Sequence, residues 1–278
     1  MVNGVSFGVC STAANQDQRR LLSTSGENPA AARLIGNLDL HVSRGEQNYR
    51  GMKLSFRRRS ADGVSLNGNY TLSRCFGDVT TGGFPQLAQG YTNPADPDYD
   101  RGHCDQDRTH LASFTVGYRT PEFSNAGLRV VASNWRVSGI INARSGSWLT
   151  VTTGRDVTLI GQRFQEQRVN QVLDDPYGDG TPARYLNPAA FAQQPLGTFG
   201  NHERNSIRGP NYWAADLALS RLVMLGSHTL EVRFESFNLT NNFNWGNPNT
   251  TLSAGAFGSI RAMSGDLRIM QFGIKYGF

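Results

Sequence analysis

The chain has 278 residues, of which 38% are hydrophobic, 18% charged and 10% aromatic, and its formal net charge is +5. This composition excludes disorder driven by charge, and the sequence has no run of about 18 or more apolar residues that would predict a membrane-spanning helix. The mean hydropathy of −0.43 still permits a membrane β-barrel, because strands that alternate lipid-facing and lumen-facing residues average to a mildly hydrophilic value.

The beginning of the chain gives little structural signal. Residues 1–20 lack a basic stretch followed by an apolar run of about 7–15 residues, so no secretory signal is predicted there. We treat residues 1–33 as a poorly defined N-terminal segment. The densest basic run, Arg57-Arg58-Arg59, ends an alternating segment and is interpreted as a solvated strand end, with a contact to anionic groups as the alternative. Because the basic residues do not otherwise cluster with aromatic residues, we expect no nucleic-acid partner.

Alternating apolar and polar residues predict strands over much of the remaining chain. Together they make about eight strands, most of them roughly 9–11 residues long, which is the length that a tilted strand needs to cross a bilayer. In chain order the predicted strands cover residues 34–42, 49–58, 63–73, 110–119 and 135–153, then the segments around 213–219 and 230–234, and finally residues 270–278.

The joints between these strands have unequal lengths. The short ones are Gly45–Gln47, Ser60–Asp62, Pro121–Asn134 and Leu222–Ser227, whereas the segments 74–108, 154–210 and 240–266 are long. From residue 59 onward the short and long joints alternate. Outer-membrane barrels have short periplasmic turns and long extracellular loops. We therefore predict an all-β fold: an incomplete portion of an antiparallel up-and-down transmembrane β-barrel, with about eight strands and long extracellular loops. We expect it in the bacterial outer membrane, in contact with its lipid; a soluble secreted β-sandwich binding module is the alternative.

Two cysteines flank one of the long loops. Cys75 and Cys104 lie near the ends of segment 74–108, whereas Cys10 stands alone. We predict a disulfide between Cys75 and Cys104, which requires an oxidising compartment. A metal site formed by His103, Cys104 and His110 is the weaker alternative, because no Cys-x-x-Cys pair accompanies them.

The acidic residues between positions 96 and 107 have roughly the spacing of a calcium loop. Arg101 stands where the turn glycine is needed, and the last ligand position holds Asp107 in place of the usual glutamate. We interpret this segment as a solvated acidic loop, with calcium binding as the alternative. Asp174, Asp175 and Asp179 form a weaker version of the same pattern, and we expect neither a metal nor a cofactor.

The sequence lacks the common catalytic motifs. It has no nucleophile elbow, no His-Glu-x-x-His zinc site and no phosphate-binding glycine loop, and Ser145-Gly146-Ser147 does not complete an elbow. We therefore predict that the chain is not an enzyme. A ligand, whose class the sequence does not define, is expected on the long loops, where aromatic residues lie among Asn and Asp: Tyr91, Tyr99, Tyr177, Phe199 and Trp245.

Several ordered sequence blocks carry a family resemblance. They are YRGMKL at 49–54, WRVSGI at 135–140, NPAAF at 187–191, GTFGN at 197–201, RNSIRGP at 204–210, FESFNLTNNF at 234–243, GNPNT at 246–250, FGSI at 257–260 and RIMQFGIKYGF at 268–278. These blocks resemble the C-terminal end of Oar-like TonB-dependent outer-membrane receptors.

The resemblance implies a gated transporter with a barrel of about 22 strands, an N-terminal plug, a preceding carboxypeptidase-regulatory-like sandwich and a short box that binds TonB. It identifies residues 34–278 as the C-terminal part of such a barrel, with TonB as a partner only through an N-terminal region that this chain lacks. A truncated gene, a miscalled start or a fragment would each explain why the resemblance covers only this part of a receptor. A self-contained eight-stranded barrel with a structural or adhesive role is the alternative.

The last strand resembles the assembly signal that the barrel-insertion machinery reads. Phe272, Ile274, Tyr276 and Phe278 alternate along it, and an amphipathic strand with an unpaired edge is suited to pairing with another sheet. The alternative is that these residues only face lipid as part of an aromatic girdle. Both roles can hold together, so we expect the insertion machinery and the membrane lipid as partners.

Overall fold

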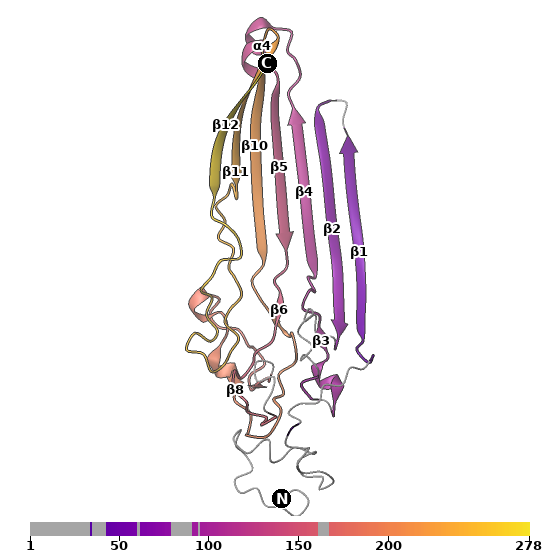
Figure 1. Cartoon of the computed structure of the whole chain (residues 1–278), viewed down its shortest axis with the longest axis vertical. Coiled ribbons are helices and arrows are strands. Elements are labelled where there is room, and N and C mark those ends of the chain that lie inside the picture. Colours follow the sequence, from indigo (N-terminus) through magenta and orange to yellow (C-terminus); the bar gives the residue numbers. More distant parts are fainter. Residues whose placement is uncertain (1–33, 35–42, 60–61, 79–90, 94, 161–166) are drawn as a thin grey trace, which may run out of the picture.

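The computed structural model describes residues 34, 43–59, 62–78, 91–93, 95–160 and 167–278. The predicted N-terminal segment 1–33 and, apart from Leu34, the predicted strand at 34–42 lie outside these residues. Most of the regular structure belongs to one eight-stranded antiparallel sheet with the order β1-β2-β4-β5-β10-β11-β12, and the short β3 pairs with β2 off this path (Figure 1). The strands are β1 (Gln47–Arg59), β2 (Val64–Gly77), β3 (Gly102–His103), β4 (His110–Arg119), β5 (Trp135–Arg144), β10 (Tyr212–Leu225), β11 (His228–Phe237) and β12 (Ile269–Gly277).

The remaining elements are short. No helix in the described ranges is long and apolar enough to cross a membrane. Outside the large sheet, β6 (Trp148–Leu149) pairs with β9 (Ile207–Arg208), and β7 (Asn170–Gln171) pairs with β8 (Phe191–Ala192). The helices are η2 (Pro97–Asp100), α4 (Ala126–Ala132), η3 (Pro182–Arg184) and η4 (Pro188–Ala190).

The predicted all-β, up-and-down fold class is confirmed, and the differences lie at strand ends. The predicted strand 135–153 is too long, because the sheet pairing of β5 stops at Arg144. The hairpin between β10 and β11 is tighter than predicted: Leu225 pairs with His228, which leaves a two-residue turn. Gly226 makes this turn with a φ of 65°, a conformation that a two-residue hairpin favours and that glycine adopts without strain.

One face of the sheet is a continuous apolar surface. The strand register aligns apolar residues from neighbouring strands in rows; Phe114, Ile141 and Ala215 form one such row. On β12, Phe272 and Ile274 are 81% and 76% exposed. An apolar surface of this extent is unfavourable in water, whereas it is what the lipid-facing side of a barrel requires.

Aromatic side chains border this apolar face at both ends of the strands. Tyr70 and Trp213 lie near the loop end, and Trp135 lies near the turn end, opposite Arg221. At about 3.3 Å per residue, the step from Trp213 to Arg221 covers roughly 27 Å along β10. A strand tilt of about 35–45° reduces this to a height of roughly 20 Å, close to the ~25 Å apolar band of outer-membrane barrels.

The opposite face of the sheet is mainly polar. Ser55 donates a hydrogen bond to Asn69 at 2.9 Å, and on β11 Arg233 forms ion pairs with Glu231 and Glu235 at 3.2 and 3.3 Å. These residues alternate with the apolar ones, as expected of a lumen-facing surface. We call this side the lumen face.

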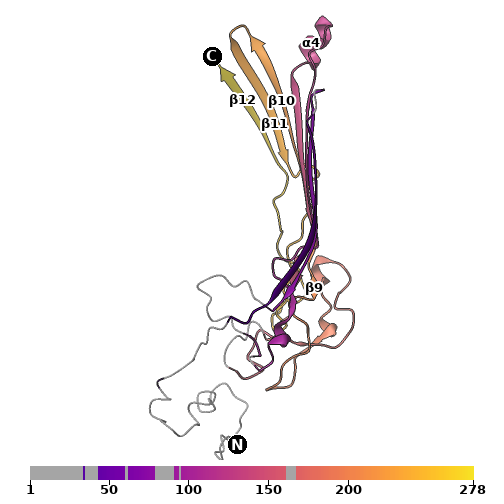
Figure 2. The ribbon, with the colours of Figure 1, turned by 90° about the vertical axis from the view of Figure 1, so that its right-hand side faces the viewer.

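The sheet is open at both edges. Within the described residues β1 pairs with β2 alone and β12 with β11 alone, so the path does not close on itself. Figure 2 shows the sheet as a thin single layer with irregular structure at one end. The short turns, α4 and the C-terminus lie at the opposite end. The predicted sorting of short and long connections is therefore present in space.

We expect Leu217→Arg to reduce the amount of protein inserted in the outer membrane. Leu217 lies on the apolar face between the two aromatic levels, where an arginine costs about 2–4 kcal/mol in a barrel wall. Folded protein in washed outer membranes, measured by extraction with urea, would report this loss. Ala218→Arg is the matched control, because Ala218 lies on the lumen face opposite Glu235; equal behaviour of the two variants would contradict the assignment of the faces.

Candidate functional site: a folded cap

The long connections fold into a body at one end of the sheet. We call this body the cap, and it consists of the described residues in 91–109, 145–210 and 238–266. It has its own core, in which Val151, Val169 and Leu186 are fully buried and Phe191 and Ile207 nearly so. Phe191 also meets Phe257 edge to face, with ring centres 5.7 Å apart. The cap is therefore a packed unit and not a set of independent solvent-exposed loops.

A disulfide ties the cap to the sheet. Cys75, near the end of β2, is bonded to Cys104, which directly follows β3, and the two cysteines are 29 residues apart in the sequence. The backbone N–H of Cys104 also donates to the carbonyl of Cys75 at 3.1 Å. Closing a loop of this length stabilises the folded state by about 3–4 kcal/mol if the effect is mainly on the entropy of the unfolded chain.

A buried ion pair joins two of the long connections. The Arg168 guanidinium donates to the Asp100 carboxylate at 2.7 Å, and both side chains are at least nine-tenths buried. The same guanidinium lies 3.5 Å from the centre of the Tyr99 ring and donates to the carbonyl of His202 at 2.8 Å. The backbone N–H of Thr92 donates to the second Asp100 oxygen. These contacts compensate the buried charges, which would otherwise be strongly unfavourable.

Arg204 and its neighbour strengthen the same junction. Arg204 pairs with Asp105 at 3.2 Å and donates to the carbonyl of Asp100 at 3.1 Å. The Asn205 side chain donates to the carbonyl of His103 at 2.6 Å. At Gly102 the chains approach so closely that a Cβ atom would lie 2.2 Å from the Arg204 carbonyl oxygen, so only glycine fits there.

Trp148 lies at the centre of an aromatic and cationic stack. The His103 ring is parallel to it at 3.8 Å, and the Arg208 guanidinium covers it at 3.7 Å. The Trp148 N–H donates to Asp107 at 3.0 Å, and the same carboxylate oxygen contacts His103 Nδ1 at 2.8 Å. Burial lowers the pKa of His103, and the hydrogen bond with Asp107 opposes this change. The stack fixes the loop around Asp107 against β6 and β9.

The interpretation of residues 96–107 as a solvated acidic loop is wrong for Asp100 and Asp107, which are 5% and 3% exposed. Their carboxylates bind Arg168, and His103 with Trp148, as described above. No group of three His, Cys, Asp or Glu within the described part of the chain is arranged to hold a metal ion. The acidic segment is therefore used to hold the cap together.

The other metal candidates also have local partners. Cys104 is in the disulfide, whereas His110 contacts the Tyr70 hydroxyl at 2.7 Å. Asp175 and Asp179 accept hydrogen bonds from the backbone N–H groups two residues ahead. Such short-range bonds are typical of turns.

The aromatic residues proposed for ligand binding have different roles. Tyr99 is covered by Arg168, donates to the carbonyl of Gly200 at 2.8 Å and meets Phe199 edge to face. The Tyr177 hydroxyl accepts from the backbone N–H of Arg208 at 2.9 Å. Trp245 is 40% exposed. Tyr91 donates to Asp78 at 3.0 Å. Tyr99 and Phe199 are thus structural, and Trp245 is available to a ligand.

The arginines that organise the cap were missed by reasoning from single motifs. Arg168 is 68 residues from Asp100, so no local spacing marks the pair. Arg204 and Arg208 do lie in the RNSIRGP block that carries part of the family resemblance. That block was the sequence signal from which a role for Arg204 and Arg208 could have been inferred.

The proposed assembly-signal residues lie together on one face of β12. Phe272, Ile274 and Tyr276 are more than half exposed, and Phe278 follows the end of the strand. Phe234 packs against Phe272 with ring centres 5.0 Å apart. Recognition of these residues by the insertion machinery stays a prediction.

Comparison with known protein families gives one match that covers nearly the whole chain. The family described as "Outer membrane beta barrel domain" matches residues 2–271. No curated protein and no solved structure matches significantly.

We expect Arg168→Met to open the cap. The substitution leaves the Asp100 carboxylate buried without its cation, which costs about 3–5 kcal/mol. Hydrogen exchange of the cap backbone in outer-membrane preparations would measure the change in opening free energy. Arg101→Met is the control, because its pair with Asp98 is 3.8 Å long and exposed and should contribute at most about 1 kcal/mol. Similar losses in both variants would contradict the structural role of Arg168.

We expect acid to loosen the cap through His202. This side chain is 1% exposed, and burial, with the Arg168 charge, lowers its pKa from 6.5 to about 4. Because the unfolded chain takes up the proton first, the stabilisation is complete above about pH 6.5 and is lost as the pH falls toward 4. Its size is on the order of 3 kcal/mol.

Proteolysis of the cap between pH 7 and 4 would reveal this dependence. His202→Gln should weaken the dependence, and His103, whose pKa is also lowered by burial, should account for part of what remains. His228→Gln should leave it unchanged, because His228 is exposed at the turn end. An unchanged profile in His202→Gln would assign the effect to another group.

Proposed function

The chain belongs to the outer membrane beta barrel domain family, which places it in the bacterial outer membrane, and we propose that it forms the wall and cap of an Oar-like TonB-dependent receptor. The observation that supports this most is the packed cap, which covers one end of an open antiparallel sheet with an apolar outer face. We propose that the cap recognises a ligand without chemically changing it.

The open edges favour a wall segment over a self-contained barrel. A closed barrel needs its first and last strands to pair, and in the described part of the chain β1 and β12 pair only inward. A receptor barrel of about 22 strands would use this sheet as one part of its wall. A soluble β-sandwich is disfavoured by the exposed apolar face, because a sandwich buries such a face against a second sheet.

The proposed partners follow from the edge strand β12 and from the apolar face of the sheet. We propose that the exposed aromatic edge of β12 is read by the barrel-insertion machinery through strand pairing. The apolar face contacts membrane lipid. In this proposal TonB would act through a region outside the 278 residues, and no nucleic acid takes part.

Labelling of introduced cysteines tests the orientation on which the receptor depends. In a Cys10→Ser background, Glu203→Cys places a thiol on the exposed surface of the cap, and Ser227→Cys places one in the β10–β11 turn. A membrane-impermeant maleimide should label position 203 on intact cells and position 227 only after the outer membrane is permeabilised. The reverse pattern would refute an extracellular cap.

Migration on a gel separates a wall segment from a complete barrel. The chain produced alone and folded in detergent should show no compact monomer band that shifts on heating, because its edges remain open. A heat-modifiable monomer would instead support the self-contained barrel and contradict the wall segment.

A further inference from the structure

A cleft of about 450 Å³ opens on the lumen face where the sheet meets the cap. Its volume lies in the range of small-molecule sites. The lining comes from β2, β4, β5 and β10 and from the segment between β11 and β12. Its polar members are Asn69, Thr71, Ser113, Asn142, Arg144, Tyr212 and Ser264.

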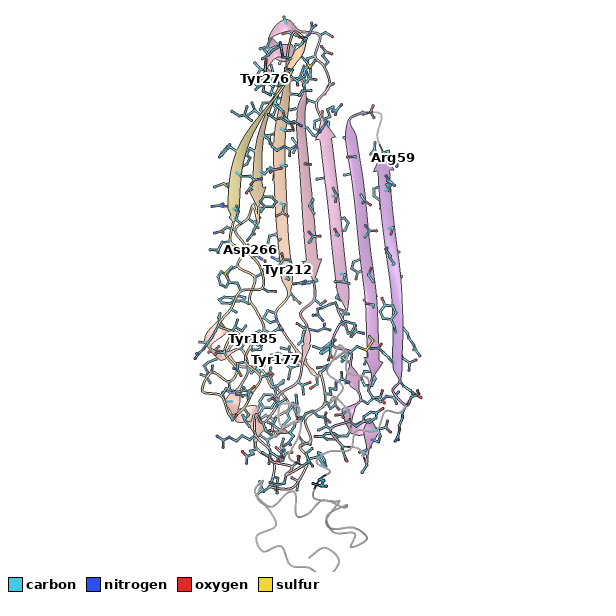
Figure 3. All side chains as sticks on the ribbon, viewed as in Figure 1. Arg59, Tyr177, Tyr185, Tyr212, Asp266 and Tyr276 are labelled. Carbon is cyan, nitrogen blue, oxygen red and sulfur yellow. A yellow bond between two sulfur atoms is a disulfide. The ribbon has the colours of Figure 1, made fainter. Side chains whose placement is uncertain are left out.

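Strand pairing places the main groups of the cleft side by side. Thr71 pairs with Leu111, Leu111 with Arg144, and Arg144 with Tyr212, so these residues form one row across four strands. Asn69 and Asn142 lie one lumen-facing row further along the strands. Figure 3 shows Tyr212 at the cap end of β10. Apart from Ser264, the residues that line the cleft therefore lie on strands of the sheet and not on loops.

Arg144 gives the cleft a positive charge. Its guanidinium lies 4.6 Å from the centre of the Tyr212 ring, which holds it in place and leaves its N–H groups available. No Asp or Glu is among the residues that line the cleft. The nearest lumen-face carboxylate along β10, Asp216, accepts the backbone N–H of Asn238 at 2.8 Å.

A second cation adds to this charge. The pKa of Arg108, in the adjoining part of the cap, is lowered by burial and by the charge of Arg144. Arg108 donates to the backbone carbonyls of Asp105 and Asp107, and the charge of Asp107 partly offsets its own. The charge that a ligand in the cleft would meet directly is therefore that of Arg144, the one arginine in its lining.

We propose that this cleft binds a small hydroxylated carboxylate, such as an acidic sugar, with Arg144 as the carboxylate-binding residue. A planar guanidinium binds a carboxylate through two parallel hydrogen bonds. The amides of Asn69 and Asn142 and the hydroxyls of Thr71 and Ser264 can both donate to and accept from sugar hydroxyls. Leu111 supplies an apolar contact. The inference rests on the proposed receptor function and names the class of its ligand.

Binding can be measured by saturation-transfer NMR and calorimetry with the full chain in the outer-membrane preparation or in detergent. The probes are glucuronate, glucose and glucose 6-phosphate, which differ in the anionic group. We expect binding of glucuronate and none of glucose. Glucose 6-phosphate that bound as tightly as glucuronate would overturn the preference for a carboxylate.

Two variants separate the site from unspecific attraction. Arg144→Gln should weaken glucuronate binding about tenfold or more. Arg136→Gln removes a charge from the same strand and the same face, outside the cleft, and should leave binding unchanged. Equal effects of the two variants, or no glucuronate binding by the unmodified chain, would overturn the inference. The labelling of position 203 would still report on the extracellular cap, so failure of the ligand assignment is distinguishable from failure of the receptor.

Discussion

The structure depends on one constraint: in lipid, no water is available to satisfy a backbone N–H or C=O group. Each such group must bond within the protein, and an unsatisfied one costs several kcal/mol. Long antiparallel pairs, such as β1 with β2 and β11 with β12, meet this requirement along their shared edges. The outer edges of β1 and β12 carry the same requirement, so each of them needs a pairing partner wherever it lies in lipid.

In the cap, the groups that need partners are buried polar and charged side chains. Its long connections carry many polar groups, and burying them is favourable only where each has a partner. Asp100 with Arg168, and Asp107 with His103 and Trp148, are such pairings. They convert segments that are distant in the chain into one body over a small hydrophobic core. The cap thus combines a rigid interior with exposed groups such as Trp245.

The strands could be predicted because a wall between lipid and lumen imposes a period of two on the sequence, and the strand at 110–119 has the predicted bounds. The ends of the strands were harder to predict than their centres. Residues after 144 stay partly extended, but Trp148 pairs with Arg208 in the cap and not with the sheet. Contacts such as Arg168 with Asp100 join residues with no shared local pattern, so the cap interior could not be predicted. The cleft around Arg144 likewise exists only once four strands are in register.

The depth of the cleft has a consequence for the path of a ligand. Tyr212 is adjacent in β10 to Trp213, which belongs to the aromatic level at the loop end of the apolar face. Arg144 pairs directly with Tyr212, so in the proposed orientation the cleft lies at the height of the outer head groups and beneath the cap. A molecule bound at Arg144, as proposed, would already have left the surrounding medium. The cap would then act as the first selective barrier, and the cleft as the first resting place on the inner side of that barrier.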